Sequence, residues 1–385
     1  MITLCIPTKN RAEFLGRILR YYANTRSPHW IFIGDSSDPE QARDNQEHVA
    51  RLNGALQIEY RHYPGCSSCE CLERLTEFVT TPYCAYVADD DFLCTQGIER
   101  AIQFLEHHAD YTAAHGRGAI FQTEAGGAYG AVTSVRRYPQ AVVEAATAAG
   151  RLTQFFTSSY YALVYSVHRT EIWRAMFKGI SLLQGTTNSN IFKDELIASC
   201  VSVIRGKVKG LDGLYLLRHA HEAMYKHPRV YDWITSREWF PSYEFFRARL
   251  TEELIQQDGI HAEEAEHVIR QVFWPYLVRV LISGWEKWRT LTPPQPPSRI
   301  RQFLKRVPGM RRAVLGLRAM KRRWQNELSL PALLDRSSAY HEDFMPLYQV
   351  ITTQPVRFPD VRVPTGRHEP VDLAEVSAHA GNVKP

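Results

Sequence analysis

The strongest constraint on the fold of this chain is a regular alternation of strand-like and helix-like segments over its first 110 residues. Short apolar runs are separated by segments whose apolar residues recur at helical spacing. The runs that predict strands are residues 2–7, 30–35, 56–63 and 83–88, and the segments that predict helices are 11–25, 41–54, 71–81 and 96–108. This order predicts βαβ units, and therefore an α/β fold with a mostly parallel, Rossmann-like sheet flanked by helices.

Polar residues stand at the ends of three of these strands. The first strand runs into Pro7, Thr8, Lys9, Asn10 and Arg11, the second into Gly34, Asp35, Ser36 and Ser37, and the fourth into Asp89, Asp90 and Asp91. Ligands of parallel sheets bind beyond the carboxyl ends of the strands. We therefore expect these side chains to gather along one edge of the sheet and to form a binding site there.

Three adjacent carboxylates in YCAYVADDDFL (83–93) repel one another and have no packing use. Hard divalent cations prefer carboxylate oxygens, and Mg²⁺ sites commonly use one or two carboxylates together with substrate phosphates. The cluster therefore predicts a Mn²⁺ or Mg²⁺ site beside a diphosphate. Strand alternation would send Asp89 and Asp91 to one side and Asp90 to the other. A solvated acidic loop is the alternative, although such a loop would favour polar residues at the positions where Phe92 and Leu93 follow.

ITLCIPTKNRAEFL, IGDSS and YVADDDFL, in this order and spacing, resemble the nucleotide-sugar domain of family 2 glycosyltransferases, which have the GT-A fold. The resemblance covers roughly residues 1–220. It implies an inverting glycosyltransferase that uses a nucleotide sugar, most commonly a UDP-sugar. It also implies that a set of strand-end residues holds the nucleotide, namely Pro7, Thr8, Arg11, Asp35, Asp89 and Asp90. By the same resemblance Asp89 and Asp91 bind the metal.

The family also has an acidic pair that opens a later helix and deprotonates the acceptor hydroxyl. KDELIAS (193–199) occupies the corresponding place, with Asp194 matching the Asp of the pair and Lys193 where a Glu is usual. This departure leaves open whether Asp194 or Glu195 is the base. Acidic residues in a first helical turn also serve as caps, with no catalytic meaning.

The run RHAHE (218–222) follows a strand-like segment and lies after the proposed base. Arg218 could pair with phosphate, and His219 or His221 could be a further metal or diphosphate ligand. In the family a His or Arg of this region often closes over the diphosphate, and we favour His221 as the metal ligand. Surface histidines in a loop are the alternative.

The seven cysteines are an odd number scattered along the chain, which favours reduced thiols in a cytoplasm over a disulfide scaffold. Cys66, Cys69 and Cys71 include a C-x₂-C spacing, but no second pair follows, so we do not expect zinc. The start of the chain lacks the pattern of a secretory signal, and no apolar run is long enough to span a membrane.

The C-terminal part is predicted to be a helical extension. We expect a catalytic domain over 1–235, a helical region over 236–355 and a poorly ordered tail over 356–385. Residues 298–324 carry ten Lys or Arg and no acid among apolar residues, which is typical of a segment that lies on an anionic membrane surface. A solvated helix packed on its own domain is the alternative. Without a recognition motif, nucleic acid is not an expected partner.

These observations predict a metal-dependent inverting glycosyltransferase in surface polysaccharide or glycoconjugate synthesis, cytoplasmic and peripheral on the inner face of the cell membrane. Its acceptor would be a carbohydrate or a lipid-linked molecule. A sugar-nucleotidyltransferase is one alternative, although such enzymes usually carry a Gly-rich loop after the first strand and IPTKNRAEFL has no glycine. A non-catalytic scaffold that binds nucleotide or membrane is the other.

Overall fold

The computed structural model describes residues 1–158, 162–183, 190–224, 226–289 and 327–354. The chain divides into two compact units, Met1–Thr353 and Gln354–Pro385, and every element below belongs to the first. The basic segment 298–324, predicted to lie on a membrane surface, and the tail 356–385, predicted to be poorly ordered, lie outside the described residues. The division at residue 235 likewise stays a prediction.

One nine-stranded sheet forms the centre of the described chain, in the order β3-β2-β1-β4-β8-β6-β9-β5, with β7 paired to β6. In chain order the strands are β1 (Ile2–Thr8), β2 (Trp30–Asp35), β3 (Gln57–His62), β4 (Tyr83–Tyr86), β5 (Phe92–Leu93), β6 (Tyr111–Thr123), β7 (Val132–Tyr138), β8 (Val167–Arg169) and β9 (Lys207–His219). The half β3-β2-β1-β4 is parallel throughout.

The second half of the sheet is mixed. Strand β8 runs antiparallel to both β4 and β6, whereas β6 and β9 are parallel, and β5 and β7 pair antiparallel to β9 and β6. The predicted α/β fold class, with a helical C-terminal region, is confirmed.

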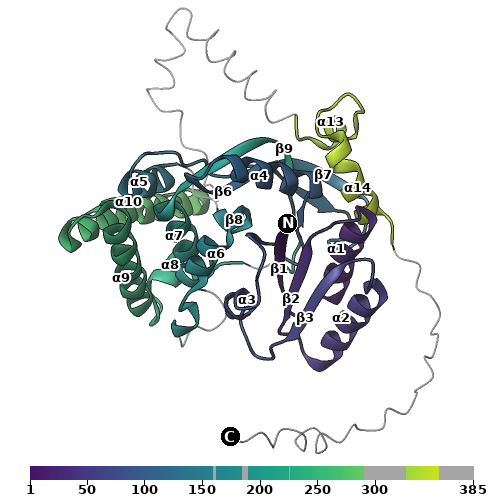
Figure 1. The fold of residues 1–385 in the computed structure, drawn as a ribbon, viewed down its shortest axis with the longest axis horizontal. Helices are drawn as coiled ribbons and strands as arrows, with labels where there is room; N and C mark the ends of the chain where they lie inside the picture. Colours follow the sequence, from purple (N-terminus) through teal and green to yellow (C-terminus); the bar gives the residue numbers. More distant parts are fainter. Residues whose placement is uncertain (159–161, 184–189, 225, 290–326, 355–385) are drawn as a thin grey trace, which may run out of the picture. The chain divides into compact units, whose positions relative to one another are not determined.

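Helices cover both faces of the sheet (Figure 1). The α-helices are α1 (Ala12–Asn24), α2 (Pro39–Leu52), α3 (Ser68–Thr76), α4 (Thr95–His107), α5 (Ala148–Thr157), α6 (Thr170–Phe177), α7 (Ile197–Arg205), α8 (Val230–Ile234), α9 (Trp239–Asp258), α10 (Ala262–Arg289), α13 (Leu330–Leu334) and α14 (His341–Thr352). Short 3₁₀ turns η1 (Leu163–Tyr165) and η2 (Ile180–Leu182) and the π-helical turn η3 (Phe192–Leu196) complete the list.

The strand order fixes which helix lies on which face. Right-handed crossovers from β1 to β2 and from β2 to β3 place α1 and α2 on one face, and the return crossover from β3 to β4 places α3 on the other. Strand β1 pairs with β2 so that Thr8 lies opposite Asp35. The carboxyl ends of β1, β2 and β4 therefore meet at one edge, where the loops that carry the polar residues begin.

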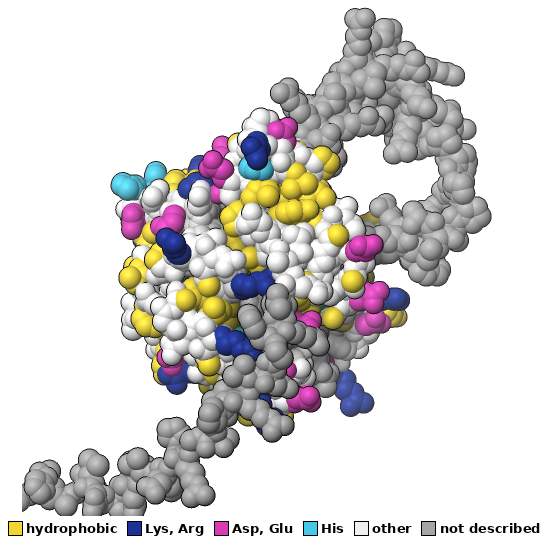
Figure 2. Space-filling view, turned by 90° about the vertical axis from the view of Figure 1, so that its right-hand side faces the viewer, with side chains coloured by type: hydrophobic (Ala, Val, Ile, Leu, Met, Phe, Trp, Pro, Cys, Tyr) yellow, Lys and Arg dark blue, Asp and Glu magenta, His cyan; other side chains and the backbone are white. Residues whose placement is uncertain are grey.

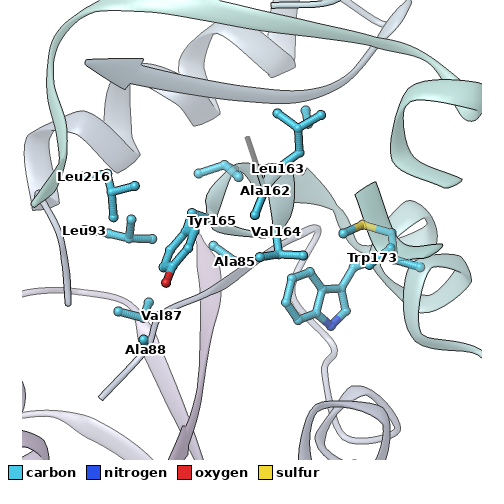
Figure 3. Packing of buried hydrophobic residues seen from close by; sticks show 14 of the residues in the cluster. Ala85, Val87, Ala88, Leu93, Ala162, Leu163, Val164, Tyr165, Trp173 and Leu216 are labelled. Atoms are coloured by element: carbon cyan, nitrogen blue, oxygen red, sulfur yellow. The ribbon is translucent and has the colours of Figure 1, made fainter. Parts of the chain in front are cut away.

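A buried apolar layer supports the chain that leads into the aspartates (Figure 3). Ala85 and Val87 are fully buried, and Tyr165 of η1 packs beside them with its hydroxyl directed toward Val87 and Ala88. Trp173 of α6 is buried in the same layer and donates from its indole N–H to Thr76 Oγ1 of α3 at 2.9 Å. This packing holds α3, α6 and the end of β4 in fixed positions behind the site.

The helices α9 and α10 enclose an aromatic cluster around Phe192, whose ring centroid lies 5.0 Å from that of Phe246 and 5.6 Å from that of Phe273. Since Phe192 is the first residue of η3, the C-terminal helices directly support the turn that carries Asp194 and Glu195. No helix of the described residues is long and apolar enough to cross a membrane. On the face shown in Figure 2, Lys and Arg side chains are interspersed with Asp and Glu.

Candidate active site

A cavity of 1220 Å³ opens at the carboxyl ends of the parallel strands. Its lining brings together residues that are far apart in the chain: Pro7, Lys9 and Arg11 after β1, Asp89 and Asp90 after β4, Asp194 and Glu195 of η3, and Arg218 of β9. The strand-end carboxylates and the two candidate bases therefore face the same cavity. Asp35, Asp91 and His221 are not among the residues that line it.

The loop after β1 carries Arg11 over the aspartates. Asn10 has a left-handed backbone with φ of 55°, a conformation that Asn adopts more readily than most residues. The backbone N–H of Asn10 donates to Ser37 Oγ at 2.7 Å, which ties this loop to the loop after β2. The turn at Asn10 brings Arg11 back, so that Nη1 donates to Asp90 Oδ2 at 2.9 Å and to Asp89 Oδ1 at 3.1 Å.

Each of the three aspartates has its own set of donors. Asp89 also accepts from Thr8 Oγ1 at 2.7 Å. Asp90 also lies 2.8 Å from His221 Nε2. Asp91 accepts from Tyr165 Oη at 2.8 Å, from Arg218 Nε at 3.0 Å and from the backbone N–H of His219 at 2.9 Å.

The side chains do not alternate as the sequence analysis expected. Strand β4 ends at Tyr86, so residues 87–91 form a turn in which strand alternation does not apply. As a result Asp89 and Asp90 both meet Arg11 at the cavity, whereas Asp91 is turned inward and is 1% exposed.

Burial and neighbouring charges give the three carboxyls different proton affinities. Burial, together with the charge of Asp90, raises the pKa of Asp89 to about 7 despite Arg11 and Thr8. Burial would also raise the pKa of Asp90, but His221, Arg11 and Arg218 hold it below its ordinary value. Burial raises the pKa of Asp91 in spite of the charge of Arg218. The raised pKa of Asp89 shows that the side chains around it do not fully compensate its negative charge.

A divalent cation would find two suitable carboxylates here. Asp89 and Asp90 line the cavity side by side, and their oxygens are the ligand type that Mn²⁺ and Mg²⁺ prefer. Within the described part of the chain no group of three or more His, Cys, Asp or Glu side chains is arranged to hold a metal ion. Two carboxylates nevertheless suffice where substrate phosphates and water supply the other ligands. The uncompensated charge on Asp89 fits such an ion.

Asp35 and His221, which the sequence suggested as ligand-binding residues, are hydrogen-bonded to other side chains of the protein. Asp35 is fully buried and accepts from the Ser37 backbone N–H at 2.7 Å, from Asn45 Nδ2 at 2.8 Å and from Tyr60 Oη at 2.5 Å. This arrangement fixes the loop after β2. The imidazole of His221 is buried, bonded to Asp90 and stacked on Phe14 at 4.7 Å between ring centroids. In this geometry His221 orients Asp90.

The candidate bases lie on η3, a π-helical turn, which is a rare conformation that occurs frequently at functional sites. Asp194 Oδ2 accepts from the Asn190 backbone N–H at 2.9 Å, and its Oδ1 lies 3.7 Å from the Cys69 thiol. Glu195 Oε1 lies 2.9 Å from His227 Nε2. Lys193 pairs with Glu70 at 3.0 Å.

Several residues at this site were not singled out from the sequence. Arg17 is fully buried on α1 and donates to the backbone carbonyl of Asp90 at 2.6 Å. Tyr165 belongs to the short 3₁₀ turn η1 and His227 to a loop, and no periodicity predicts the course of either segment. The only available signal for His227 was its place nine residues after Arg218 in a His-rich stretch.

No family model matches the chain, and no curated protein matches it. The solved structures that resemble it include S. aureus TarS 1-349 in complex with UDP-GlcNAc, with a TM-score of 0.45 and 13% identity over 70% of this chain and 71% of that one. A mannosyltransferase from Pyrobaculum calidifontis in complex with GDP-Man and Mn²⁺ has a TM-score of 0.36 and 12% identity over 77% and 76%. The chain spans 42% of the longer TarS chain in a further match, with 11% identity and a TM-score of 0.45.

Proposed function

We propose that this protein is a glycosyltransferase that moves a sugar from a nucleoside-diphosphate sugar to a hydroxyl acceptor with inversion. One observation carries the proposal: Asp89 and Asp90 with Arg11, and Asp194 with Glu195, line the same cavity at the carboxyl ends of the parallel strands. The first group suits the diphosphate of the donor, and the second group offers a proton acceptor. The cavity of 1220 Å³ is large enough for a nucleotide sugar.

The described side chains divide the reaction between them. Arg11 and Lys9 line the cavity and would bind the anionic diphosphate. A Mn²⁺ or Mg²⁺ ion held by Asp89 and Asp90 would stabilise the charge of the leaving diphosphate by several kcal/mol. A carboxylate of η3 would take the acceptor proton, which typically contributes ~10²–10⁴-fold in rate. Attack from the face opposite the leaving group inverts the anomeric carbon.

The donor nucleotide and the biological role belong to the same proposal. UDP is the donor nucleotide expected from the resemblance to family 2 glycosyltransferases. A carbohydrate or lipid-linked acceptor fits synthesis of a surface polysaccharide or glycoconjugate. Attachment to an anionic membrane through residues 298–324 would place the enzyme beside a lipid-linked acceptor. The domain division at residue 235 would then separate the nucleotide-sugar-binding part from a helical region that carries the membrane-associated segment.

The test is calorimetry of UDP, GDP and their sugar conjugates with and without Mn²⁺, followed by turnover assays. We expect one nucleotide to bind more tightly with Mn²⁺, turnover to stop on chelation with EDTA, and the product to have the inverted anomeric configuration by NMR. Asp90→Asn should lose metal-enhanced binding, whereas Asp44→Asn on the exposed side of α2 should behave as wild type. Absence of nucleotide binding under all conditions would refute the proposal and favour the scaffold alternative.

A further inference from the structure

A second cavity, of 570 Å³, adjoins the first. Glu195 and His227 line both cavities, so these two side chains form part of the wall between them. The other walls of the second cavity come from β7, the residues around η1 and η3, and α10, and they include Tyr138, Ile191, Tyr276 and Val280. The C-terminal helical region therefore contributes directly to the surroundings of Glu195.

The second cavity has the lining expected of a small-molecule site. Aromatic and aliphatic side chains predominate, with Thr157 and Ser283 adding hydroxyls, and its volume lies within the usual range for ligand pockets. Burial, and then the carboxylate of Glu195, raises the pKa of Tyr276, so its phenol stays neutral. Burial and Glu195 also raise the pKa of Tyr138.

Arg279 also lines this cavity, and its guanidinium is bonded to the neighbouring helix α5. Its guanidinium donates to the backbone carbonyls of Phe156 at 2.6 Å and of Thr157 at 3.3 Å, at the C-terminal end of α5. Cations in this position stabilise the last carbonyls of a helix. The cavity therefore offers neutral rings and hydroxyls, one carboxylate that is paired with His227, and one guanidinium that is bonded to backbone carbonyls, which suits an uncharged, hydroxyl-rich ligand.

The two acidic residues of η3 differ in which cavities they line. Asp194 lines only the first cavity, and its bond to the Asn190 N–H satisfies a free donor at the start of the helical turn, as a capping residue does. Glu195 reaches both cavities and is held by His227. A base must touch both the acceptor and the space where the donor sugar lies, and within the pair only Glu195 meets this requirement.

We propose that the second cavity is the acceptor subsite, that it takes a neutral pyranoside, and that Glu195 is the base. This inference rests on the proposed glycosyltransferase function. The acceptor hydroxyl oxygen forms a bond to the anomeric carbon of the donor, and the bond from that carbon to the diphosphate oxygen breaks. The bonding electron pair leaves with the diphosphate, and the hydroxyl proton moves to the Glu195 carboxylate.

Filling the second cavity tests the subsite without touching the donor cavity. Val280→Trp should raise the KM for methyl pyranosides of glucose, galactose, mannose and N-acetylglucosamine about tenfold or more, whichever of them is used, equivalent to about 1.4 kcal/mol or more. Nucleotide affinity should stay within about twofold of wild type. Val278→Trp, at a position 51% exposed on the same helix, is the matched control and should match wild type in both measurements.

Two carboxamide variants test the base. Glu195→Gln should lower kcat by ~10²–10⁴-fold with unchanged nucleotide affinity, and this loss should exceed that of Asp194→Asn, which should also lose thermal stability. Wild-type KM in Val280→Trp, transfer only to acidic or phosphorylated sugars, or a larger kcat loss in Asp194→Asn than in Glu195→Gln would overturn the inference. If the protein binds nucleotide and one of these results appears, the proposed function stands and only this inference fails.

Discussion

His221 Nε2 lies 2.8 Å from Asp90 Oδ2, and this hydrogen bond accounts for much of the difference in pKa between Asp90 and its neighbour Asp89. Asp90 has both His221 and Arg11 beside it, whereas Asp89 shares Arg11 and adds only the neutral hydroxyl of Thr8. The pKa of Asp90 is therefore below its ordinary value, and that of Asp89 is raised to about 7. At neutral pH the Asp90 carboxyl is therefore ionised, whereas the pKa of the Asp89 carboxyl beside it is close to neutral pH.

Asp89→Asn should stabilise the ligand-free fold at pH 8. The pKa of the Asp89 carboxyl is raised from 3.8 in the unfolded chain to about 7 in the folded protein. Between these two pH values the folded protein binds a proton that the unfolded chain does not, so stability falls as pH rises through this range. Removing the carboxylate should raise the free energy of unfolding at pH 8 by up to about 4 kcal/mol, the equivalent of about three pKa units. The gain should be smaller at pH 5.

Urea denaturation at the two pH values measures this effect, and Asp44→Asn, which changes an exposed carboxylate, is the control. The enhancement of nucleotide binding by Mn²⁺ should be lost in the same Asp89 variant, because a carboxylate proposed to hold the metal is gone. A greater loss of stability at pH 8 than at pH 5 would contradict the assignment of uncompensated charge to Asp89.

His227→Gln should lower stability at acidic pH more than at alkaline pH. Burial opposes protonation of His227, but Glu195 and Asp194 outweigh both burial and the charge of Arg218, so its pKa is raised above 6.5. Its stabilising contribution is complete below the pKa of the unfolded state and is lost as pH rises through the folded-state value. We expect a loss of about 1–2 kcal/mol at pH 5.5, typical of a charged hydrogen bond that is partly exposed.

Thermal unfolding at pH 5.5 and pH 9 measures the His227 effect, and His107→Gln at an exposed position of α4 is the comparison. Turnover gives a second measurement: wild-type activity should rise as His227 loses its proton and releases Glu195, and the glutamine variant should lack this rise. Equal stability loss at both pH values would show that the ion pair with Glu195 does not form in solution.

The sequence predicted the α/β class because hydrophobic periodicity reports directly on strands and helices that pack against a core. The parallel half of the sheet follows from this, as the segments around Ile2–Thr8 and Trp30–Asp35 show. Strand β8, with three residues, and β5, with two, are too short to display any period. The antiparallel pairing of β8 and β5 therefore had no signal in the sequence.

At the site, residue types could be predicted more reliably than orientations. The strand-end position of the three aspartates was readable from the chain, but the turn over residues 87–91 decides which of them face the cavity. Asp91 is turned toward Tyr165 and Arg218, partners contributed by segments 74 and 127 residues away. His227 meets Glu195 only through tertiary structure, and single-residue contacts of this kind leave no local pattern.

Gly97→Ala should destabilise the protein even though alanine favours helix. A Cβ at Gly97 of α4 would lie 2.6 Å from the Leu214 carbonyl oxygen and 2.9 Å from Tyr215 Cα, and both atoms belong to the backbone of β9. The gain in helix propensity is about 1 kcal/mol, whereas overpacking against backbone typically costs about 1–3 kcal/mol. We expect a net loss in urea denaturation. Gly127→Ala, where a Cβ meets nothing within 4 Å, should be nearly neutral; equal effects in the two variants would contradict the close packing of α4 on β9.

Glu253→Gln should destabilise the contact between α9 and the helix that follows η3. Glu253 is 2% exposed and accepts from Arg205 Nε at 2.7 Å and from Arg249 Nη2 at 2.9 Å. Removing its charge leaves two guanidinium groups close together without a carboxylate, and breaking a buried ion pair costs about 3–5 kcal/mol.

The two arginine side chains are 23% and 15% exposed, so solvent should reduce the loss from Glu253→Gln to the lower end of that range, about 3 kcal/mol. Glu47→Gln is the matched control, because Glu47 pairs with Arg51 on the surface with its side chain 55% exposed, and it should change stability by about 0.5 kcal/mol or less. Since α7 continues directly from η3, turnover should fall together with stability in Glu253→Gln. Full stability in this variant, measured by urea denaturation, would show that α9 is held by its apolar contacts alone.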